Sequence, residues 1–198
     1  MYNKLKIISA AIICCLAFVS CNDSDLAKQM DGTWLASYKT DEDGTRQKVK
    51  QTMTFQYDAE DEENDGTFVE EISGVLNETD PKAGTVQCKY RSRIEGTWII
   101  SFGDLCLEYD VRTLKVEVDS KDVKVNPTDL KAQMGMAAIN MLGMDITKSL
   151  ANEIRNNLRE NLAEHYEDEA PYGNLKVSDT EMSFESDDLG RITFHRIK

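Results

Sequence analysis

The sequence has few of the residues from which most enzyme and metal sites are built. It contains only two histidines, His165 and His195, and they lie far apart in the chain. A zinc site needs three or four ligands at characteristic spacings, and the sequence shows no such spacing. It also has neither a Gly-x-Ser-x-Gly motif nor a cysteine–histidine signature of nucleophilic catalysis. We therefore expect no enzyme, and no catalytic residue, metal or cofactor.

Positive charge is also scarce. The 23 Lys and Arg residues are outnumbered by 36 Asp and Glu residues, which gives a formal net charge of −13. Binding of nucleic acid needs a basic surface, and so does attraction to an anionic lipid surface. The composition therefore argues against both functions. After residue 21 there is also no apolar run long enough to cross a membrane.

The first 21 residues have the features of a bacterial lipoprotein signal. Lys4 and Lys6 precede an apolar stretch, residues 7–19, and the segment Leu16-Ala17-Phe18-Val19-Ser20-Cys21 resembles a lipobox. Cleavage before Cys21 would remove the two lysines and change the net charge from −13 to −15. We expect Cys21 to be lipidated and to anchor the protein in a lipid bilayer, at the bacterial outer membrane or cell surface.

The rest of the chain is expected to form a short tether and one domain. Residues 1–20 are the predicted signal peptide, residues 21–30 the tether, and residues 31–198 the folded domain. Asn22-Asp23-Ser24-Asp25 resembles the acidic export tag of some surface lipoproteins. The same residues also suit a solvated tether without a further role.

Cys88 and Cys106 are the two cysteines that remain after the signal. An extracytoplasmic location permits them to pair. Cys88 is in phase with Val86 and Tyr90, however, whereas Cys106 is out of phase with its apolar neighbours. The sequence leaves open a disulfide and two unpaired thiols.

Most of residues 34–118 alternate between apolar and polar side chains, as half-buried strands do. Val49, Gln51, Met53, Phe55 and Tyr57 are one such set. We predict a bulge at Gly74, a tight turn at Glu95-Gly96, and a bulge or bend between Val111 and Leu114. Short strands return at 175–177, 181–184 and 191–197. The spacing predicts a mainly β fold, an antiparallel up-and-down β-barrel, with a sandwich as the alternative.

Residues 127–168 interrupt the strands with helical spacing. Apolar residues recur from Leu130 to Met141 and again from Ile146 to Leu162, with Gly143 between them. We predict two amphipathic helices, or one that is kinked at Gly143. This helical insert could plug an open barrel end or pack outside the wall. Its methionines, Met134 and Met141 among them, could line a pocket or pack in the core.

Two segments resemble the lipocalin-like (calycin-like) fold of some bacterial lipoproteins. Asp31-Gly32-Thr33-Trp34 lies where that family has its Gly-x-Trp signature, and Ile192-Thr193-Phe194-His195-Arg196 resembles its closing strand. The resemblance implies that Arg196 packs over Trp34 and closes one end of the barrel beside Gly32. The chain departs from the family in placing its helical segment before the last strands.

The densest acidic run, residues 58–66, superficially resembles a calcium loop. The twelfth position of such a loop should be a bidentate glutamate, and here it is Ile72. We therefore interpret this run as a solvated hairpin tip.

These features predict a non-catalytic binding protein. The leading hypothesis is a lipid-anchored barrel that binds a small apolar ligand by shape and burial. The expected wall residues are Phe55, Tyr57, Tyr90, Trp98, Met134 and Met141. The alternative is a structural or interaction protein with a filled barrel that contacts a protein or glycan partner.

Overall fold

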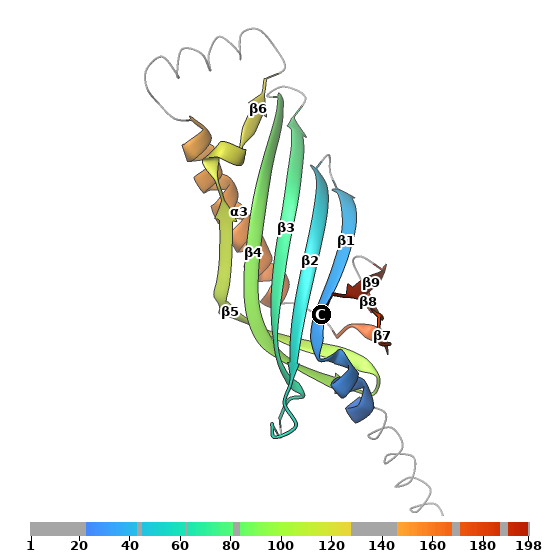
Figure 1. The fold of residues 1–198 in the computed structure, drawn as a ribbon. Coiled ribbons are helices and arrows are strands. Elements are labelled where there is room, and N and C mark those ends of the chain that lie inside the picture. The colour runs from blue at the N-terminus through green and yellow to red at the C-terminus, as the bar shows by residue number, and fades with distance from the viewer. Residues whose placement is uncertain are drawn as a thin grey trace, which may run out of the picture.

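The computed structural model describes residues 23–42, 45–61, 63–80, 84–127, 146–167, 171–186 and 190–197. Within these residues one mainly antiparallel sheet of nine strands dominates the fold (Figure 1). The elements are β1 (Gly32–Glu42), β2 (Thr45–Tyr57), β3 (Gly66–Asp80), β4 (Gly84–Ser101), β5 (Asp104–Val118), η1 (Ser120–Asp122), β6 (Lys124–Asn126), α3 (Ile146–Glu167), β7 (Gly173–Val177), β8 (Glu181–Ser186) and β9 (Gly190–Arg196). A short helical segment over residues 23–30 precedes β1.

The sheet is an up-and-down arrangement that curves into a half-barrel (Figure 1). Its strand order is β5-β4-β3-β2-β1-β9-β8-β7, and β6 pairs with β4 outside this path. At one end the two edges of the sheet meet, because Leu105 in β5 and Tyr172 before β7 exchange two backbone hydrogen bonds of 2.9 Å. The predicted antiparallel β architecture, with a helix before the last strands, is confirmed.

Alternation along each strand explains which face is buried. In β2 the side chains of Val49, Met53 and Phe55 face inward and are buried, while Lys50 between them is exposed. The inner face therefore carries the core, and the outer face carries the polar residues. The bulge predicted between Val111 and Leu114 is also confirmed, because the pairing of β4 with β5 shifts register there.

Two predicted irregularities are wrong, and both involve a glycine that accommodates an aromatic ring. No turn forms at Glu95-Gly96, since β4 continues from residue 84 to 101. A Cβ at Gly96 would lie 2.7 Å from the ring of Phe68. No bulge forms at Gly74 either, because it pairs regularly with Val49 and Tyr90. A Cβ there would lie 2.3 Å from the Tyr90 ring. These glycines make room for side chains on neighbouring strands.

The largest core cluster fills the end at which the sheet edges meet. Trp34, Phe55, Phe68, Trp98 and Phe194 are each at most 1 % exposed. Phe55 meets Trp98 edge to face, with ring centroids 5.5 Å apart. The helical segment 23–30 belongs to the same cluster through two fully buried residues, Ala27 and Met30.

Helix α3 packs on the inner side of the sheet near β4 and β5. Leu158 and Leu162 contact a cluster that contains Ile94 and Val116. Leu150 and Ile154 contact a second cluster around Cys88. The second predicted helix is therefore confirmed, and it lies on the inner face rather than outside the wall. Among the described helices, none is both long and apolar enough to cross a membrane.

Cys88 and Cys106 are both free thiols. Cys106 pairs with Ile99, far along β4 from Cys88, so no bridge can form between them. Of the two alternatives that the sequence leaves open, unpaired thiols are the one observed.

Candidate ligand-binding cavity

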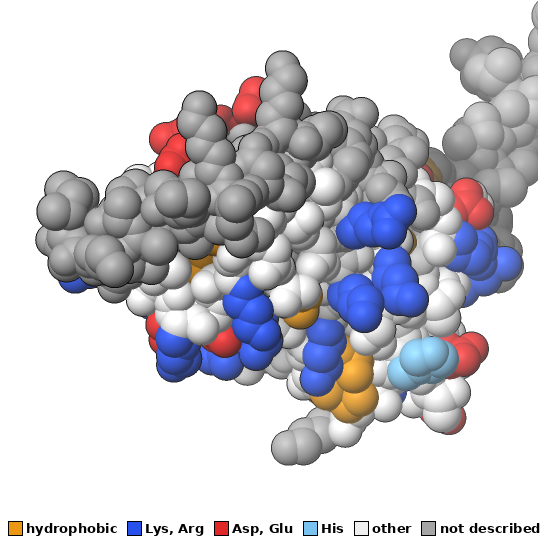
Figure 2. Space-filling view, turned by 90° about the horizontal axis from the view of Figure 1, so that it is seen from above, with side chains coloured by type: hydrophobic (Ala, Val, Ile, Leu, Met, Phe, Trp, Pro, Cys, Tyr) orange, Lys and Arg blue, Asp and Glu red, His pale blue; other side chains and the backbone are white. Residues whose placement is uncertain are grey.

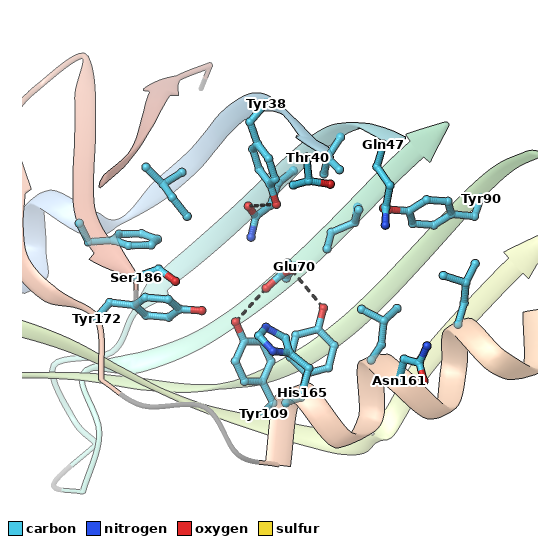
Figure 3. A pocket seen from close by; sticks show the side chains of 18 residues that line it. Tyr38, Thr40, Gln47, Glu70, Tyr90, Tyr109, Asn161, His165, Tyr172 and Ser186 are labelled. Atoms are coloured by element: carbon cyan, nitrogen blue, oxygen red, sulfur yellow. Dashed lines mark hydrogen bonds between the residues drawn. The ribbon is translucent and has the colours of Figure 1, made fainter. Parts of the chain in front are cut away.

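A cavity of about 510 Å³ lies between the inner face of the sheet, helix α3 and the β7–β9 segment (Figure 3). Its walls combine apolar side chains with hydroxyl, amide and carboxyl groups. The apolar lining residues are Val49, Ile72, Leu158, Leu162, Phe184 and Ile192. The polar and aromatic ones are Tyr38, Thr40, Gln47, Gln51, Glu70, Tyr90, Tyr109, Asn161, His165, Tyr166, Tyr172 and Ser186.

Glu70 is the most unusual residue of the cavity, because it is a carboxylate that is only 2 % exposed. It lies in β3 between Phe68 and Ile72 in the inward phase of the strand, so the alternation of the strand points it at the cavity. Figure 3 shows its carboxyl group in the centre of the labelled side chains. A buried carboxylate is costly unless hydrogen bonds or an opposite charge compensate it.

Two tyrosines from different elements donate hydrogen bonds to Glu70. The hydroxyl of Tyr109 in β5 lies 2.9 Å from Oε2, and that of Tyr166 in α3 lies 3.1 Å from Oε1. Their rings stack on each other, with centroids 4.3 Å apart. Burial raises the pKa of the Glu70 carboxyl, and hydrogen bonds from Tyr109, Tyr166 and the side chain of Gln51 offset part of this rise.

On β2, Gln51 links Glu70 to Tyr38 in β1, and a separate hydrogen bond joins Gln47 to Tyr90 in β4. The hydroxyl of Tyr38 donates to Oε1 of Gln51 at 3.2 Å, and that of Tyr90 donates to Oε1 of Gln47 at 2.9 Å. Burial raises the pKa of Tyr90 to about 12. The pKa of Tyr38 is also raised, mainly by burial and secondly by the charge of Glu70. Both phenols therefore stay protonated, as hydrogen-bond donors, at neutral pH.

The raised pKa of Glu70 predicts a specific pH dependence of stability. The folded state favours the protonated acid, so this contribution to stability is complete below the ordinary glutamate pKa and is lost as the pH rises through the raised one. In Glu70→Gln this loss is absent. As the pH rises, the free energy of unfolding of Glu70→Gln should therefore increase relative to that of the wild type. The increase should be about 1.4 kcal/mol for each unit by which folding raises the pKa of Glu70.

Urea denaturation of both proteins across the range from about pH 4 to pH 9 measures this difference. Glu117→Gln is a matched control, because Glu117 is exposed on β5. A difference between Glu70→Gln and the wild type that stays constant over the whole range would contradict the prediction.

Of the four predicted wall residues that the structure describes, only Tyr90 lines the cavity. Phe55 and Trp98 are each 1 % exposed and pack in the core at the end where Leu105 and Tyr172 join the two sheet edges, which we call the closed end. Tyr57 is partly buried against that core. Met134 and Met141 lie outside the described residues, as does Cys21.

The expected contact between Arg196 and Trp34 is present. The guanidinium carbon lies 4.1 Å from the centre of the indole ring, and the two residues are paired across β9 and β1. The indole N–H donates to the carbonyl of Met30 at 2.8 Å, and Arg196 donates to the carbonyls of Gln29 and Asp31. These contacts attach the segment 23–30 to β1 and β9. Gly32, where β1 begins, has a φ of 130°.

Sequence reasoning missed Glu70 and its partners. The available signal was the phase of β3, since Glu70 falls on the same face as Phe68 and Ile72. Its partners Tyr109 and Tyr166 are 39 and 96 residues away in the sequence. Only the fold brings these three side chains together.

The acidic connection between β2 and β3 uses its carboxylates locally. Asp58 accepts a hydrogen bond from the backbone N–H of Glu60, and Asp61 accepts from those of Glu63 and Asn64. In the described part of the chain, no three His, Cys, Asp or Glu side chains are grouped as a metal ion would require.

The outer face of the sheet carries a basic patch. Its members are the exposed side chains Lys48, Lys50, Lys89, Arg91 and Lys115. Ser73 pairs with Lys50 on one side and with Arg91 on the other, so these two side chains are neighbours across β3. Figure 2 shows Lys and Arg side chains gathered on one side of the molecule. Acidic side chains share this face, because Glu117 is paired with Arg91 across β5 and β4 and Lys89 forms an ion pair of 3.3 Å with Asp122.

A scan against models of known protein families and a search of curated proteins both find no match for this chain.

Proposed function

We propose that this protein is a lipid-anchored, lipocalin-like binding protein whose barrel holds a small ligand with a mainly apolar body. Binding would occur without catalysis, by burial and hydrogen bonding. The anchor would be Cys21, at the outer membrane or cell surface. The observation that carries the proposal is the cavity on the inner face of the sheet, with six apolar and several hydroxyl-bearing side chains. Its volume of about 510 Å³ suits a small molecule.

Two features support the lipocalin-like barrel within this proposal. The hydrogen bonds between Leu105 and Tyr172 join the two edges of the sheet at the end that holds the aromatic core. At the same end Arg196 covers Trp34, which is the contact that the family resemblance implies. A barrel that is closed at one end and open toward α3 would form a binding cavity that a ligand can enter from the open end.

A pair of matched substitutions tests ligand binding. Val49 lines the cavity, whereas Val69 lies on the outer face of β3. We expect the purified protein to enhance the fluorescence of N-phenyl-1-naphthylamine with one site per chain. Val49→Phe narrows the cavity and should weaken probe binding by about tenfold or more. Val69→Phe adds the same atoms on the opposite face and should leave binding unchanged.

Two results would contradict the proposal. One is a wild-type protein that does not bind the probe. The other is an equal loss in both variants, which would place the probe on a surface rather than in the cavity.

The anchor has its own test. In a bacterial host that processes lipoproteins, we expect the mature chain to begin at Cys21 and to carry acyl groups. Cys21→Ser removes the thiol to which the lipid attaches, so the chain should leave the membrane fraction and show no lipid mass. Intact-mass spectrometry of both forms measures this change. An unmodified Cys21 in a membrane-bound wild type would contradict the prediction.

The basic patch on the outer face favours a second candidate function, an interaction module for an anionic glycan or an acidic protein surface. Opposite charges on two partners raise the rate and the specificity of their association. On this view Lys50→Glu combined with Arg91→Glu should abolish retention on a heparin column at low salt. If the wild-type protein is not retained, this candidate is wrong.

A further inference from the structure

Within the part of the chain that the structure describes, the Glu70 carboxylate has no cationic partner in the cavity. Among the described residues that line the cavity there is no lysine and no arginine, and the one imidazole, His165, is exposed. The known partners of the carboxylate are the hydroxyls of Tyr109 and Tyr166 and the side chain of Gln51, all of them neutral. Neutral donors stabilise a carboxylate, but they do not balance its charge. Buried charges in proteins are usually paired with an opposite charge.

The surroundings of Glu70 suit a cation. A carboxylate has about four acceptor positions on its two oxygens. The side chains of Tyr109, Tyr166 and Gln51 occupy three of them on Glu70, so about one remains for a ligand. Tyr38 and Tyr90 bring aromatic rings to the same cavity, and the faces of such rings attract cations. The negative net charge of the chain adds a long-range attraction for cations.

The apolar lining lies on both sides of this polar centre. Val49 and Ile72 come from the sheet, Leu158 and Leu162 from α3, and Phe184 and Ile192 from the last strands. A ligand that fills the cavity would therefore place apolar atoms against these side chains and one polar group at Glu70. An anionic head group would meet the like charge of the carboxylate and be disfavoured.

We infer that the ligand is a cationic amphiphile, an apolar chain or ring with one ammonium group that pairs with the Glu70 carboxylate. This inference rests on the proposed function and specifies its ligand. Glu70 would then be the residue that selects amines over neutral molecules of the same shape. The hydrogen bonds from Tyr109 and Tyr166 hold its carboxyl group in position for this role.

Competition between two ligands of equal length tests the inference. n-Octylamine and n-octanol share the same chain and differ in the head group. Each is titrated against N-phenyl-1-naphthylamine bound to the wild-type protein at neutral pH. An ammonium group loses more hydration on burial than a hydroxyl does, so apolar contact alone would favour octanol. We expect octylamine to displace the probe at a concentration at least about tenfold lower than octanol requires, because its ammonium group pairs with Glu70.

Two variants separate this effect from a general one. Glu70→Gln keeps the shape of the side chain and removes its charge, so the preference for octylamine should vanish. Glu117→Gln removes one exposed carboxylate from β5 and should keep the preference. Probe binding that persists while octanol competes as well as octylamine would overturn the inference and leave the proposed function standing. No binding of the probe at all would overturn both.

The pH dependence in the wild-type protein gives a second measurement, which does not depend on the folding of a variant. The amine stays protonated while Glu70 titrates, so the preference for octylamine should fall as the pH is lowered through the carboxyl pKa. Because that pKa is raised, the fall should occur above the range of an exposed glutamate. A preference that does not change with pH would overturn the inference.

His165 in α3 is the other ionisable side chain besides the tyrosines that lines the described cavity. Among the described lining residues, the remaining titratable groups are tyrosines: Tyr38 from β1, Tyr90 from β4, Tyr109 from β5, Tyr166 from α3 and Tyr172 before β7. His165→Gln should keep the pH dependence if it belongs to Glu70. If the octylamine preference of His165→Gln no longer changed with pH, the pH dependence would belong to the imidazole, and the role of Glu70 would be overturned.

Discussion

Trp34→Ala is expected to lower the free energy of unfolding by about 3–5 kcal/mol. Trp34 is fully buried, and its loss would leave a large cavity in the aromatic core. The substitution also removes the indole N–H that binds the buried carbonyl of Met30, and the ring on which Arg196 lies. The segment 23–30 and β9 would both lose a contact with β1. Urea denaturation followed by circular dichroism measures the change.

Trp34→Phe is the matched control for this prediction. It keeps an aromatic ring in the core and removes only the N–H and part of the volume. We expect a smaller loss, which includes about 1–3 kcal/mol for the unpaired Met30 carbonyl. If Trp34→Ala were to cost less than about 1 kcal/mol, the closed end of the sheet would not depend on this side chain.

Gly96→Ala is the second substitution with a large expected effect. An added Cβ would lie 2.2 Å from the backbone oxygen of Glu108 in β5 and 2.7 Å from the ring of Phe68 in β3. The first of these atoms belongs to a paired strand, so a side-chain rotation cannot relieve the contact. We expect a loss of about 3 kcal/mol or more, at the upper end of what overpacking costs.

Gly173→Ala provides the comparison in the same protein. The nearest atom to a Cβ at Gly173 is Oδ1 of Asp104, at 3.8 Å, which is ordinary contact. Its effect on the midpoint of urea denaturation should be within about 0.5 kcal/mol when expressed as free energy. A Gly96→Ala protein as stable as Gly173→Ala would mean that β4 and β5 separate at no cost.

The fold follows from the sequence where the pattern is local. The alternation from Val49 to Tyr57 fixes which face of β2 is buried, and the stripe from Ile146 to Leu162 fixes helix α3. The position of Gly96 could not be interpreted correctly from local pattern. Glycine is common both in turns and at positions where a ring from a neighbouring strand lies against the backbone. Only the pairing of β3 with β4 separates the two cases.

The site was less predictable than the fold. Aromatic residues on an inner face can fill a core or line a cavity, and the local pattern does not show how far along the half-barrel each residue lies. Phe55 and Trp98 lie toward the closed end and are packed, whereas Tyr38 and Tyr90 lie further along the sheet and line the cavity. In these four residues the hydroxyl group distinguishes the cavity residues, because a buried phenol needs a hydrogen-bond partner.

The buried contacts of the segment 23–30 determine how the protein would stand on a bilayer. Ala27 and Met30 are fixed in the core of the closed end. Only five residues lie between Cys21 and Ala27, so their Cα atoms are at most roughly 20 Å apart. With a lipid on Cys21, such a short connecting segment would hold the closed end against the membrane. The aromatic core would then stand between bilayer and cavity, so a ligand would enter from the aqueous side.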